Sequence, residues 1–537
     1  MDKLLLLGDE AIAQAAIDSG LSGVFAYPGT PSTEITEYIQ DSKEAKAKGI
    51  RSNWSCNEKT AMEAALGMSY AGKRAMFCCK HVGVNVAADP FMNSAITGTN
   101  GGLVYIAADD PSMHSSQDEQ DSRTYADFAM IPCLEPSNQQ EAYDMVHYAF
   151  DISEKYHTPV MIRVTTRLAH SRSAVERRDI RSNQNTMQVP EDKKQFILLP
   201  VNAKRQYKKL IAKQDDLMRE SETKGFNQLF EGKDKSLGIV ACGIGYNYLM
   251  ENFPDRKCPY SVLKISQYPM PEKQLRKLYD ESKEILVIEE GQPVYERLIQ
   301  GILKQGKKVH GRLDGTIQRD GELSPNSVGK AVGMKVLEGF ASPEVLAPRP
   351  PKLCDGCPHA DSYLCLNEAM KDMGESRVFS DIGCYTLGAL PPFSAIYSTV
   401  DMGASITIAK GAAEADLKPT VAVIGDSTFT HSGMTGLLDC CGDQIPITII
   451  ILDNDITAMT GAQKSSATGR IESICQGIGV EKEHIRVITP LKKNFEENVR
   501  IMKEEINYKG VSVIIPRRDC VVWGKKKLRM KKAAENK

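Results

Sequence analysis

The stretch AVIGDSTFTHSGMTGLLDCCGDQIPITIIILDNDITAMTG, residues 422–461, contains two apolar runs that end in small acidic or amide residues. The first run ends at Gly425-Asp426 and the second at Asp453-Asn454. Short apolar runs separated by a helical pattern predict neighbouring strands of a parallel sheet. Ligands of such sheets bind beyond the carboxyl ends of the strands. We therefore expect Asp426 and Asn454 to face one crevice.

These two residues have the chemistry of a magnesium site. A carboxylate and an amide oxygen are hard ligands of the kind that Mg²⁺ prefers, and this ion commonly takes further oxygens from phosphate. The helical stretch that starts at Ser427 opens with small polar residues, so its N-terminal amides can face an anion. On this pattern alone, two strand-end turns without a ligand remain the alternative.

The bulk composition is that of an ordinary globular protein. The 537 residues exceed the roughly 250–300 that one hydrophobic core organises, so we expect several domains. Hydrophobic residues make up 42% and charged residues 25% of the chain. A net charge of −2 gives no footprint for nucleic acid, and the basic residues 525–537 are interpreted as a solvated tail.

No part of the sequence predicts a targeting segment or a membrane span. The four leucines at residues 4–7 are followed at once by charged residues, which favours a buried strand over a signal peptide. No apolar run approaches the roughly 18 residues of a membrane-spanning helix. We therefore expect no membrane partner and a cytoplasmic location, where the fourteen cysteines are thiols or metal ligands.

Strands alternate with helical patterns near both ends of the chain, which predicts a multidomain α/β protein. Two related parallel-sheet domains, each covered by helices on both faces, are expected at residues 1–180 and 353–524. The intervening and final segments are interpreted as a polar connection with one or two surface helices, a smaller α/β domain, a proline-rich linker and the basic tail, at residues 181–235, 236–340, 341–352 and 525–537.

The glycine-aspartate-serine run followed by an asparagine resembles the diphosphate-binding motif of thiamine diphosphate enzymes. By this resemblance, Gly425, Asp426 and Ser427 belong to the cofactor site. Mg²⁺ would be held by Asp426, the Asn454 side chain and the Ile456 carbonyl. The family motif usually reads Gly-Asp-Gly, and Ser427 replaces its last glycine. Residues 353–524 would then be the diphosphate-binding domain and residues 1–180 the pyrimidine-binding domain.

Thiamine diphosphate enzymes also need a carboxylate near N1′ of the aminopyrimidine, where it takes part in acid–base catalysis through the cofactor. The stretch SCNEKTAMEAALG, residues 55–67, offers Glu58 at the start of an alanine-rich helix. Two other interpretations stay open. Glu58 is also an acid that a helix dipole favours at this position, and Glu63 lies on the same predicted helix.

Further stretches resemble the thiamine diphosphate-dependent 2-oxoacid:ferredoxin oxidoreductases. YPGTPSTE is similar to their substrate-side loop, which would bring Thr30 near the 2-oxoacid. HSSQDEQDSR is similar to a loop whose arginine pairs with the substrate carboxylate, here Arg123, and a guanidinium fork suits that role. His81 and His431 are polar candidates near the thiazolium ring, and a structural role is the alternative for each.

Six separated motifs resemble, in order, the thiamine-binding α subunits of indolepyruvate ferredoxin oxidoreductases within this family. They are YPGTPSTEI, KHVGVNVAADP, HSSQDEQDSR, CDGCPH, GDSTFTHSG and LDNDITAMTGAQ. The resemblance covers nearly the whole chain. It implies oxidative decarboxylation of aryl pyruvates to aryl-acetyl-CoA, with coenzyme A as the acyl acceptor. It also implies ferredoxin as electron acceptor and a smaller β subunit as partner.

Four cysteines are candidates for one metal site: Cys354, Cys357, Cys384 and Cys520. A C-x2-C pair with two distant cysteines suits a [4Fe–4S] cluster held by four thiolates. Related pyruvate:ferredoxin oxidoreductases place a cluster on such cysteines, beside the thiamine. A zinc site and unligated thiols remain alternatives. The adjacent pairs at residues 78–79 and 440–441 lie in apolar runs and are expected in the core.

The sequence departs from the family pattern at one point. Many α subunits of this family continue into a ferredoxin-like tail with closely spaced cysteine sets, and the sequence up to Lys537 contains no such set. The number of clusters and the electron acceptor therefore stay open. So do two other functions. A non-oxidative thiamine diphosphate-dependent 2-oxoacid decarboxylase or ligase would need no cluster, and a non-catalytic scaffold subunit would have no reason to retain Glu58, Asp426 and Asn454 together.

Overall fold

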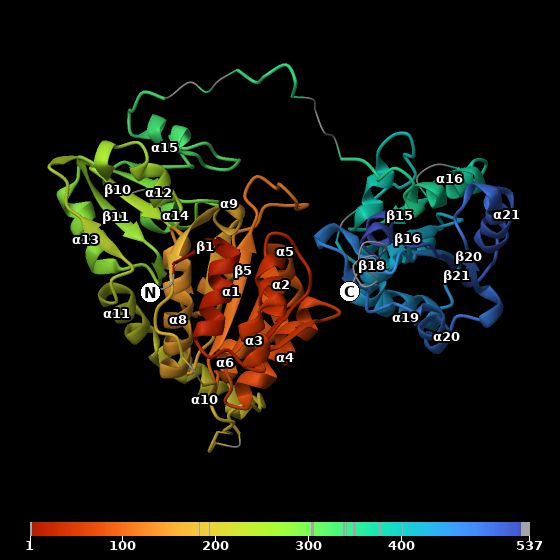
Figure 1. Cartoon of the computed structure of the whole chain (residues 1–537), viewed down its shortest axis with the longest axis horizontal. Coiled ribbons are helices and arrows are strands. Elements are labelled where there is room, and N and C mark those ends of the chain that lie inside the picture. Colours follow the sequence, from red (N-terminus) through yellow and green to blue (C-terminus); the bar gives the residue numbers. More distant parts are fainter. Residues whose placement is uncertain are drawn as a thin grey trace, which may run out of the picture. The chain divides into compact units, whose positions relative to one another are not determined.

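The computed structural model describes residues 3–527 apart from 182, 189, 193, 302–305, 337–338, 340, 347–350, 375–376 and 400. The chain forms two compact units, Met1–Phe340 and Ala341–Lys537, here called the N-terminal and C-terminal units (Figure 1). Within the described residues, no helix combines the length and the apolar character that crossing a bilayer requires.

The main sheet of the N-terminal unit has seven strands in the order β12-β6-β7-β5-β4-β2-β3. The strands are β2 (Gly23–Ala26), β3 (Arg51–Trp54), β4 (Ala75–Lys80), β5 (Leu103–Asp109), β6 (Cys133–Leu134), β7 (Val160–Thr165) and β12 (Gln267–Tyr268). All neighbours run parallel except β12, which is antiparallel to β6. The parallel sheet expected for the first part of the chain is thereby confirmed.

Helices cover both faces of this sheet because successive strand residues point to opposite sides. On β4, Met76 and Cys78 enter the core against α1 (Gly8–Asp18), α2 (Thr33–Asp41) and α8 (Gln139–Tyr156). Phe77 and Cys79 enter the opposite core against α4 (Glu58–Tyr70) and α6 (Ala88–Thr97). Both cysteines are fully buried, which confirms their prediction as core residues.

The four leucines at the start of the chain lie in a separate ribbon. β1 (Lys3–Leu7) pairs antiparallel with β8 (Arg172–Glu176) in a two-stranded sheet. Leu6 is buried, but Leu5 is 67% exposed. The expectation of a buried strand is therefore wrong for much of its length, because a two-stranded ribbon on the surface buries only one of its faces.

A second sheet of the N-terminal unit has the order β14-β13-β10-β11-β9. Its strands are β9 (Gln228–Phe230), β10 (Asp234–Cys242), β11 (Tyr260–Ile265), β13 (Glu284–Ile288) and β14 (Val309–His310). The helices of this region are α10 (Pro200–Ala212), α11 (Gln214–Thr223), α12 (Gly245–Met250), α13 (Glu272–Glu281), α14 (Val294–Gln300) and α15 (Pro325–Ala331). α10 and α11 are the surface helices expected in the polar connection.

Buried ion pairs join these two sheets into one unit. Arg163 on β7 contacts Asp109 at 2.7 Å and Glu135 at 2.5 Å within the first sheet, and it donates to the Glu290 carbonyl after β13 at 3.1 Å. Arg123 contacts Glu289, which follows β13, at 3.0 Å. All five side chains are almost completely buried. A buried charge is tolerated only with such partners, so the network holds the middle sheet firmly against the first one.

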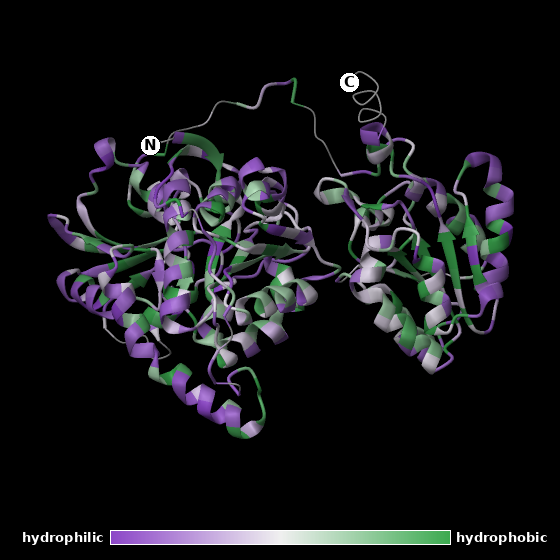
Figure 2. Cartoon of the chain, turned by 60° about the horizontal axis from the view of Figure 1, so that its bottom comes forward, coloured by the Kyte–Doolittle hydropathy of each residue, from purple (hydrophilic) through white to green (hydrophobic). Residues whose placement is uncertain are grey.

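The C-terminal unit is built on five parallel strands in the order β15-β16-β17-β21-β20. They are β15 (Val378–Ser380), β16 (Val421–Gly425), β17 (Ile447–Leu452), β20 (Ile485–Ile488) and β21 (Val511–Pro516). One face packs against α16 (Pro358–Met370) and α21 (Phe495–Ile506), the other against α17 (Ala404–Glu414), α19 (Met434–Gly442) and α20 (Ile471–Ile478). The strands are mostly green in Figure 2, since both faces are apolar and covered.

Candidate functional site

Asp426 and Asn454 lie at neighbouring strand ends of the C-terminal unit. Gly425 pairs with Leu452 at the carboxyl ends of β16 and β17, and Asp426 follows directly while Asn454 comes two residues after Leu452. Both side chains are buried, with exposed fractions of 2% and 6%. The structure thereby confirms that the two residues end adjacent parallel strands.

The carboxylate of Asp426 lacks a full set of hydrogen-bond partners within the described chain. Its Oδ2 atom is buried and has no hydrogen-bond partner. Burial, and then the neighbouring Asp453 carboxylate, raise the pKa of Asp426 to about 8, although a hydrogen bond from Ser465 opposes them. An unpaired buried carboxylate is costly, so a cation at this position would relieve the cost. The donor set therefore fits Mg²⁺.

The Asn454 side chain is held by two hydrogen bonds. Its Oδ1 accepts the Ile456 backbone N–H at 3.2 Å, and its Nδ2 donates to His359 Nε2 at 3.1 Å. Burial, followed by the charge of Arg518, lowers the pKa of His359 to about 4, so the ring is a neutral acceptor. His359 thus fixes which way the amide points. Sequence reasoning missed this role, although His359 closes the CDGCPH motif.

The helix that follows Asp426 begins in an unusual way. A short α-helical turn, α18 (Asp426–Thr428), continues through a π-helical turn at Phe429–Gly433 into α19. Such π-helical turns are rare in proteins, and those that occur often lie at functional sites. His431 is buried in this turn with Nδ1 at 2.6 Å from Ser432 Oγ. Gly425 permits the approach of Tyr385, because a Cβ atom there would lie 2.6 Å from its ring.

A third strand end carries an acid that sequence reasoning missed. Asp381 follows β15, and its carboxylate accepts the backbone N–H groups of Gly403 and Ser405, each at 3.2 Å, and the Tyr385 hydroxyl. Burial raises the pKa of Asp381 to about 7 against these hydrogen bonds. The sequence did carry a signal for this residue, since Asp381 follows an apolar run just as Asp426 does. Because its oxygens already have partners, Asp381 caps α17 rather than offering a free ligand.

The structure gathers the four candidate cysteines of the C-terminal unit in one neighbourhood. Cys354 and Cys357 form the turn before α16, where the Cys357 N–H donates to the Cys354 carbonyl at 3.0 Å. Burial, and then the electrostatic influence of Cys357, Cys520 and Cys354, raise the pKa of Cys384 to about 12. Such mutual influence requires the thiols to lie close together.

The spacing of these sulfurs bears on the kind of metal site. Among the described residues, they do not form a set of three ligand atoms within 4.8 Å of one another. One tetrahedral zinc ion, with Zn–S distances of about 2.3 Å, would hold its thiolates only about 3.8 Å apart. An iron–sulfur cluster spreads its thiolates over several iron atoms. The cysteines are therefore not arranged as a preformed zinc site, and the iron–sulfur cluster stays a prediction.

Glu58 lies at the carboxyl edge of the main sheet in the N-terminal unit. It is the first residue of α4, and its side chain is buried with an exposed fraction of 4%. Gly83 lies against it, since a Cβ atom there would be 2.7 Å from Glu58 Oε1. Glu63, by contrast, is 46% exposed and pairs with Lys59 on the helix surface. Of the two acids, only Glu58 is buried at this edge.

His81 and Thr30 lie at the same edge, on the segments that follow β4 and β2. His81 is fully buried at the start of α5 (His81–Val86), with Nε2 at 3.1 Å from the Asp118 carbonyl, and its Nδ1 has no hydrogen-bond partner in the described chain. The Thr30 carbonyl accepts the Ser115 hydroxyl at 3.5 Å. Lys80 lies between these segments, and burial lowers its pKa despite nearby carboxylates that include Glu58.

Arg123 is engaged in a different way from that expected. It begins α7 (Arg123–Ala129), and its guanidinium bonds to Asp121 at 2.8 Å and to Glu289 at 3.0 Å. It also donates to two backbone carbonyls after β13 and lines a cavity of about 700 Å³ with Tyr268. The fork that would receive a substrate carboxylate is already occupied by Asp121, which gives Arg123 a structural role here. Its role toward substrate stays a prediction.

Two family models match the chain. Residues 14–228 match "Pyruvate flavodoxin/ferredoxin oxidoreductase, thiamine diP-bdg", and residues 381–515 match "Thiamine pyrophosphate enzyme, C-terminal TPP binding domain". The first match contains Thr30, Glu58 and His81, and the second contains Asp426 and Asn454.

Curated relatives match over nearly the whole chain. Indolepyruvate oxidoreductase subunit IorA of Archaeoglobus fulgidus is 37% identical over 98% of this chain and 88% of the relative. The protein of the same name from Pyrococcus horikoshii is 35% identical over 97% of this chain and 86% of the relative. A solved 2-oxoglutarate:ferredoxin oxidoreductase from Magnetococcus marinus is 17% identical with a TM-score of 0.48, covering 58% of this chain and 62% of that chain.

Proposed function

Because this chain belongs to the family of indolepyruvate oxidoreductase subunit IorA, a family of thiamine diphosphate-binding oxidoreductases, we propose that it oxidatively decarboxylates aryl pyruvates. The products are aryl-acetyl-CoA and CO₂, and the electrons leave for ferredoxin through an iron–sulfur centre. A smaller β subunit completes the enzyme. The family that the six sequence motifs predicted is the one to which the chain belongs.

The orphaned carboxylate of Asp426 is the observation that carries the cofactor assignment. Asp426, the Asn454 side chain and the Ile456 carbonyl would hold Mg²⁺, and the amides at the start of the helix after Gly425 would face the diphosphate. His359 keeps the Asn454 amide in one orientation. Removing a positioning partner of this kind typically costs about 10–100-fold in metal affinity.

When bound, thiamine diphosphate supplies the carbon nucleophile and the electron sink for decarboxylation of a 2-oxoacid. Glu58 would exchange a proton at the pyrimidine side, where it is buried and packed against Gly83. His81 has an unused ring nitrogen with which to exchange a proton with substrate. Thr30 lies on the loop that would face the 2-oxoacid.

The four gathered cysteines support the oxidative reaction over a non-oxidative decarboxylation, which would need no electron exit. Cys354, Cys357, Cys384 and Cys520 would hold a [4Fe–4S] cluster as thiolates. Among the described residues, they are not arranged as a preformed zinc site. Coenzyme A takes the acyl group, and ferredoxin accepts one electron at a time.

The test uses the chain purified anaerobically together with its β subunit. Iron and acid-labile sulfide are measured, and reduction of a low-potential dye and release of CO₂ are followed with indolepyruvate and coenzyme A. Cys357→Ser should lose iron, sulfide and dye reduction while single-turnover CO₂ release persists. Cys441→Ser, a matched control on α19, should behave as wild type. Wild-type protein without iron and sulfide, or a Cys357→Ser variant with unchanged dye reduction, would refute the cluster.

A further inference from the structure

Three side chains that could ligate a metal converge in the N-terminal unit, and none of them is among the candidate site residues described above. Asp9 comes from the first turn of α1, Glu34 from the first turn of α2, and His170 from the end of α9 (Thr166–His170). One ligand atom of each lies within 4.8 Å of those of the other two. Three elements that are distant in sequence thus meet at one point.

Asp9 forms the floor of this group and lacks every partner expected of a buried acid. It is fully buried, and neither of its carboxylate oxygens has a hydrogen-bond partner in the described chain. The helix end does not account for it, because the Leu7 backbone N–H donates to Glu10 at 2.8 Å instead. Buried polar groups are almost always satisfied. A missing ligand is the simplest physical reason for two orphaned oxygens.

Glu34 and His170 form the open side of the group. Glu34 Oε2 and His170 Nε2 form an ion pair at 3.5 Å, and that buried oxygen has no well-formed hydrogen bond within the described residues. Their side chains are 37% and 35% exposed. The group therefore has a closed floor and an entry path from solvent, as a site that exchanges an ion needs.

We propose that Asp9, Glu34 and His170 bind a divalent transition-metal ion of the zinc class. Two carboxylates and one imidazole are the ligand types of Zn²⁺, Fe²⁺ and Mn²⁺, whereas Mg²⁺ and Ca²⁺ favour oxygen ligands alone. Three protein ligands leave coordination positions for water. This site is separate from the magnesium site of Asp426, which belongs to the C-terminal unit.

The ion would fix the start of α2 to α1 and α9. Glu34 comes four residues after Thr30, in the first turn of α2, directly after the loop at the carboxyl end of β2. That loop is also held by the Ser32 hydroxyl and by Thr33, which accepts the Gly29 backbone N–H at 3.0 Å. A metal ion at Glu34 adds a tether from the other side. Its expected effect is to stabilise the loop rather than to take part in the reaction.

Co²⁺ is the probe, added to the full chain without thiamine diphosphate. Nitrogen and oxygen ligands give weak visible bands without the near-ultraviolet band that thiolates produce, so binding here is separable from binding at the cysteines. We expect one such ion per chain, displaced by Zn²⁺. Asp9→Asn and His170→Gln should each lower the affinity for Co²⁺ by at least about 10–100-fold. That is the loss typical of removing a residue that only positions a ligand, and a ligand itself should matter at least as much.

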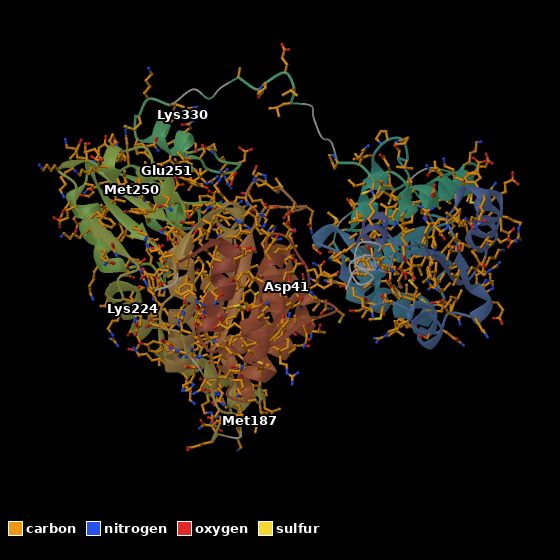
Figure 3. The ribbon with its side chains drawn as sticks, in the orientation of Figure 1. Asp41, Met187, Lys224, Met250, Glu251 and Lys330 are labelled. Atoms are coloured by element: carbon orange, nitrogen blue, oxygen red, sulfur yellow. The ribbon has the colours of Figure 1, made fainter. Side chains whose placement is uncertain are left out.

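Two matched variants control the measurement. Asp41→Asn removes the same charge as Asp9→Asn at the exposed end of α2, where Figure 3 labels it, and should bind Co²⁺ as wild type does. Asp426→Ala removes the other divalent-ion site and should keep this one. Circular dichroism checks that each variant is folded. If Asp9→Asn misfolds, His170→Gln still tests the site, because His170 is partly exposed and its substitution should not disturb the fold. Absence of the thiolate-free bands in wild type, or their persistence in His170→Gln, would overturn the proposal.

Discussion

The two units present the carboxyl edge of a parallel sheet in different ways. In the N-terminal unit, residues 110–122 form a loop after β5 that supplies its own partners, so that Asp110 accepts bonds from Ser115, Ser116 and Thr166. In the C-terminal unit, β16 passes directly into a helix, and one buried oxygen of Asp426 has no hydrogen-bond partner among the described residues. The acid at the first edge has its hydrogen-bond partners in the folded chain, whereas the acid at the second edge has room for the cation proposed above.

This difference follows from the length of the connections. A long loop has enough backbone and side-chain donors to satisfy the acids at a strand end, whereas a direct strand-to-helix turn has only the first helical amides. The short turn therefore suits cofactor phosphate and metal, and the long loop suits a shaped polar surface. We expect substitutions at the C-terminal edge to impair cofactor retention and substitutions at the N-terminal edge to lower the reaction rate.

The largest effect is expected for Asp426→Ala. It should abolish retention of thiamine diphosphate and Mg²⁺, because the carboxylate ligand is lost, while the fold persists since the substitution removes a buried polar group that lacks a full set of partners in the described chain. Calorimetric titration measures the affinity, and thermal unfolding checks the fold. Asp439→Ala, an exposed acid on α19, is the control. Wild-type affinity in Asp426→Ala would remove the assignment of this edge.

At the other edge, Glu58→Gln should keep the cofactor and lose rate. The amide cannot exchange the proton that the buried carboxyl exchanges, and loss of one acid–base role costs about 10²–10⁴-fold. Hydrogen–deuterium exchange at the cofactor C2 position and steady-state turnover measure it. Glu63→Gln changes an exposed acid on the same helix and should leave both unchanged. If exchange in Glu58→Gln equals that of wild type, the edge serves binding alone.

Arg123→Ala tests whether the buried ion pairs of Arg123 stabilise the N-terminal unit. Removing one partner of a buried ion network costs about 3–5 kcal/mol, because Asp121 and Glu289 are left unpaired. Arg178→Ala breaks an exposed pair and should cost no more than about 1 kcal/mol. Denaturant unfolding measures both. A stable Arg123→Ala variant with a raised KM for the 2-oxoacid would instead favour the carboxylate-binding role.

The sequence was sufficient where chemistry follows from local pattern. Apolar runs ending in Asp426 and Asn454 predicted adjacent strand ends, since a parallel sheet brings them together. It was insufficient where long-range contacts decide. Glu58 and Glu63 fit the same helix, and only the tertiary structure shows that Glu58 is buried against Gly83 while Glu63 is exposed. His359 was missed because its contact with Asn454 joins segments that are far apart in the chain.

The union of the first and middle sheets is a further long-range property. The short strand β12 pairs with β6, and no pattern in its two residues announces this. The ion pair of Arg123 with Glu289, which follows β13, also joins residues from distant segments. Sequence periodicity predicts which strands form, but it does not report ion pairs that lock two sheets into one compact unit.

The smallest effect is a pH dependence confined to the C-terminal edge. Burial and Asp453 raise the pKa of Asp426 to about 8, so the ligand-free chain holds a proton there at neutral pH. Because Mg²⁺ needs the ionised carboxylate, binding releases that proton. Affinity for Mg²⁺ with thiamine diphosphate should therefore rise about tenfold per pH unit up to pH 8 and then level off. The ligand-free chain should lose stability over the same rise, since its folded state binds the proton more tightly.

Calorimetry in two buffers of different ionisation enthalpy counts the released proton. Wild type should release close to one proton per bound cofactor at pH 7, and Asp426→Asn should release none in whatever binding remains. His359 does not confuse the result, because burial lowers its pKa to about 4, below this window. An affinity that is constant between pH 6 and 8 would mean that Asp426 is ionised before the metal arrives. The C-terminal edge would then be as complete without its ligand as the N-terminal one, and the contrast between the two edges would be lost.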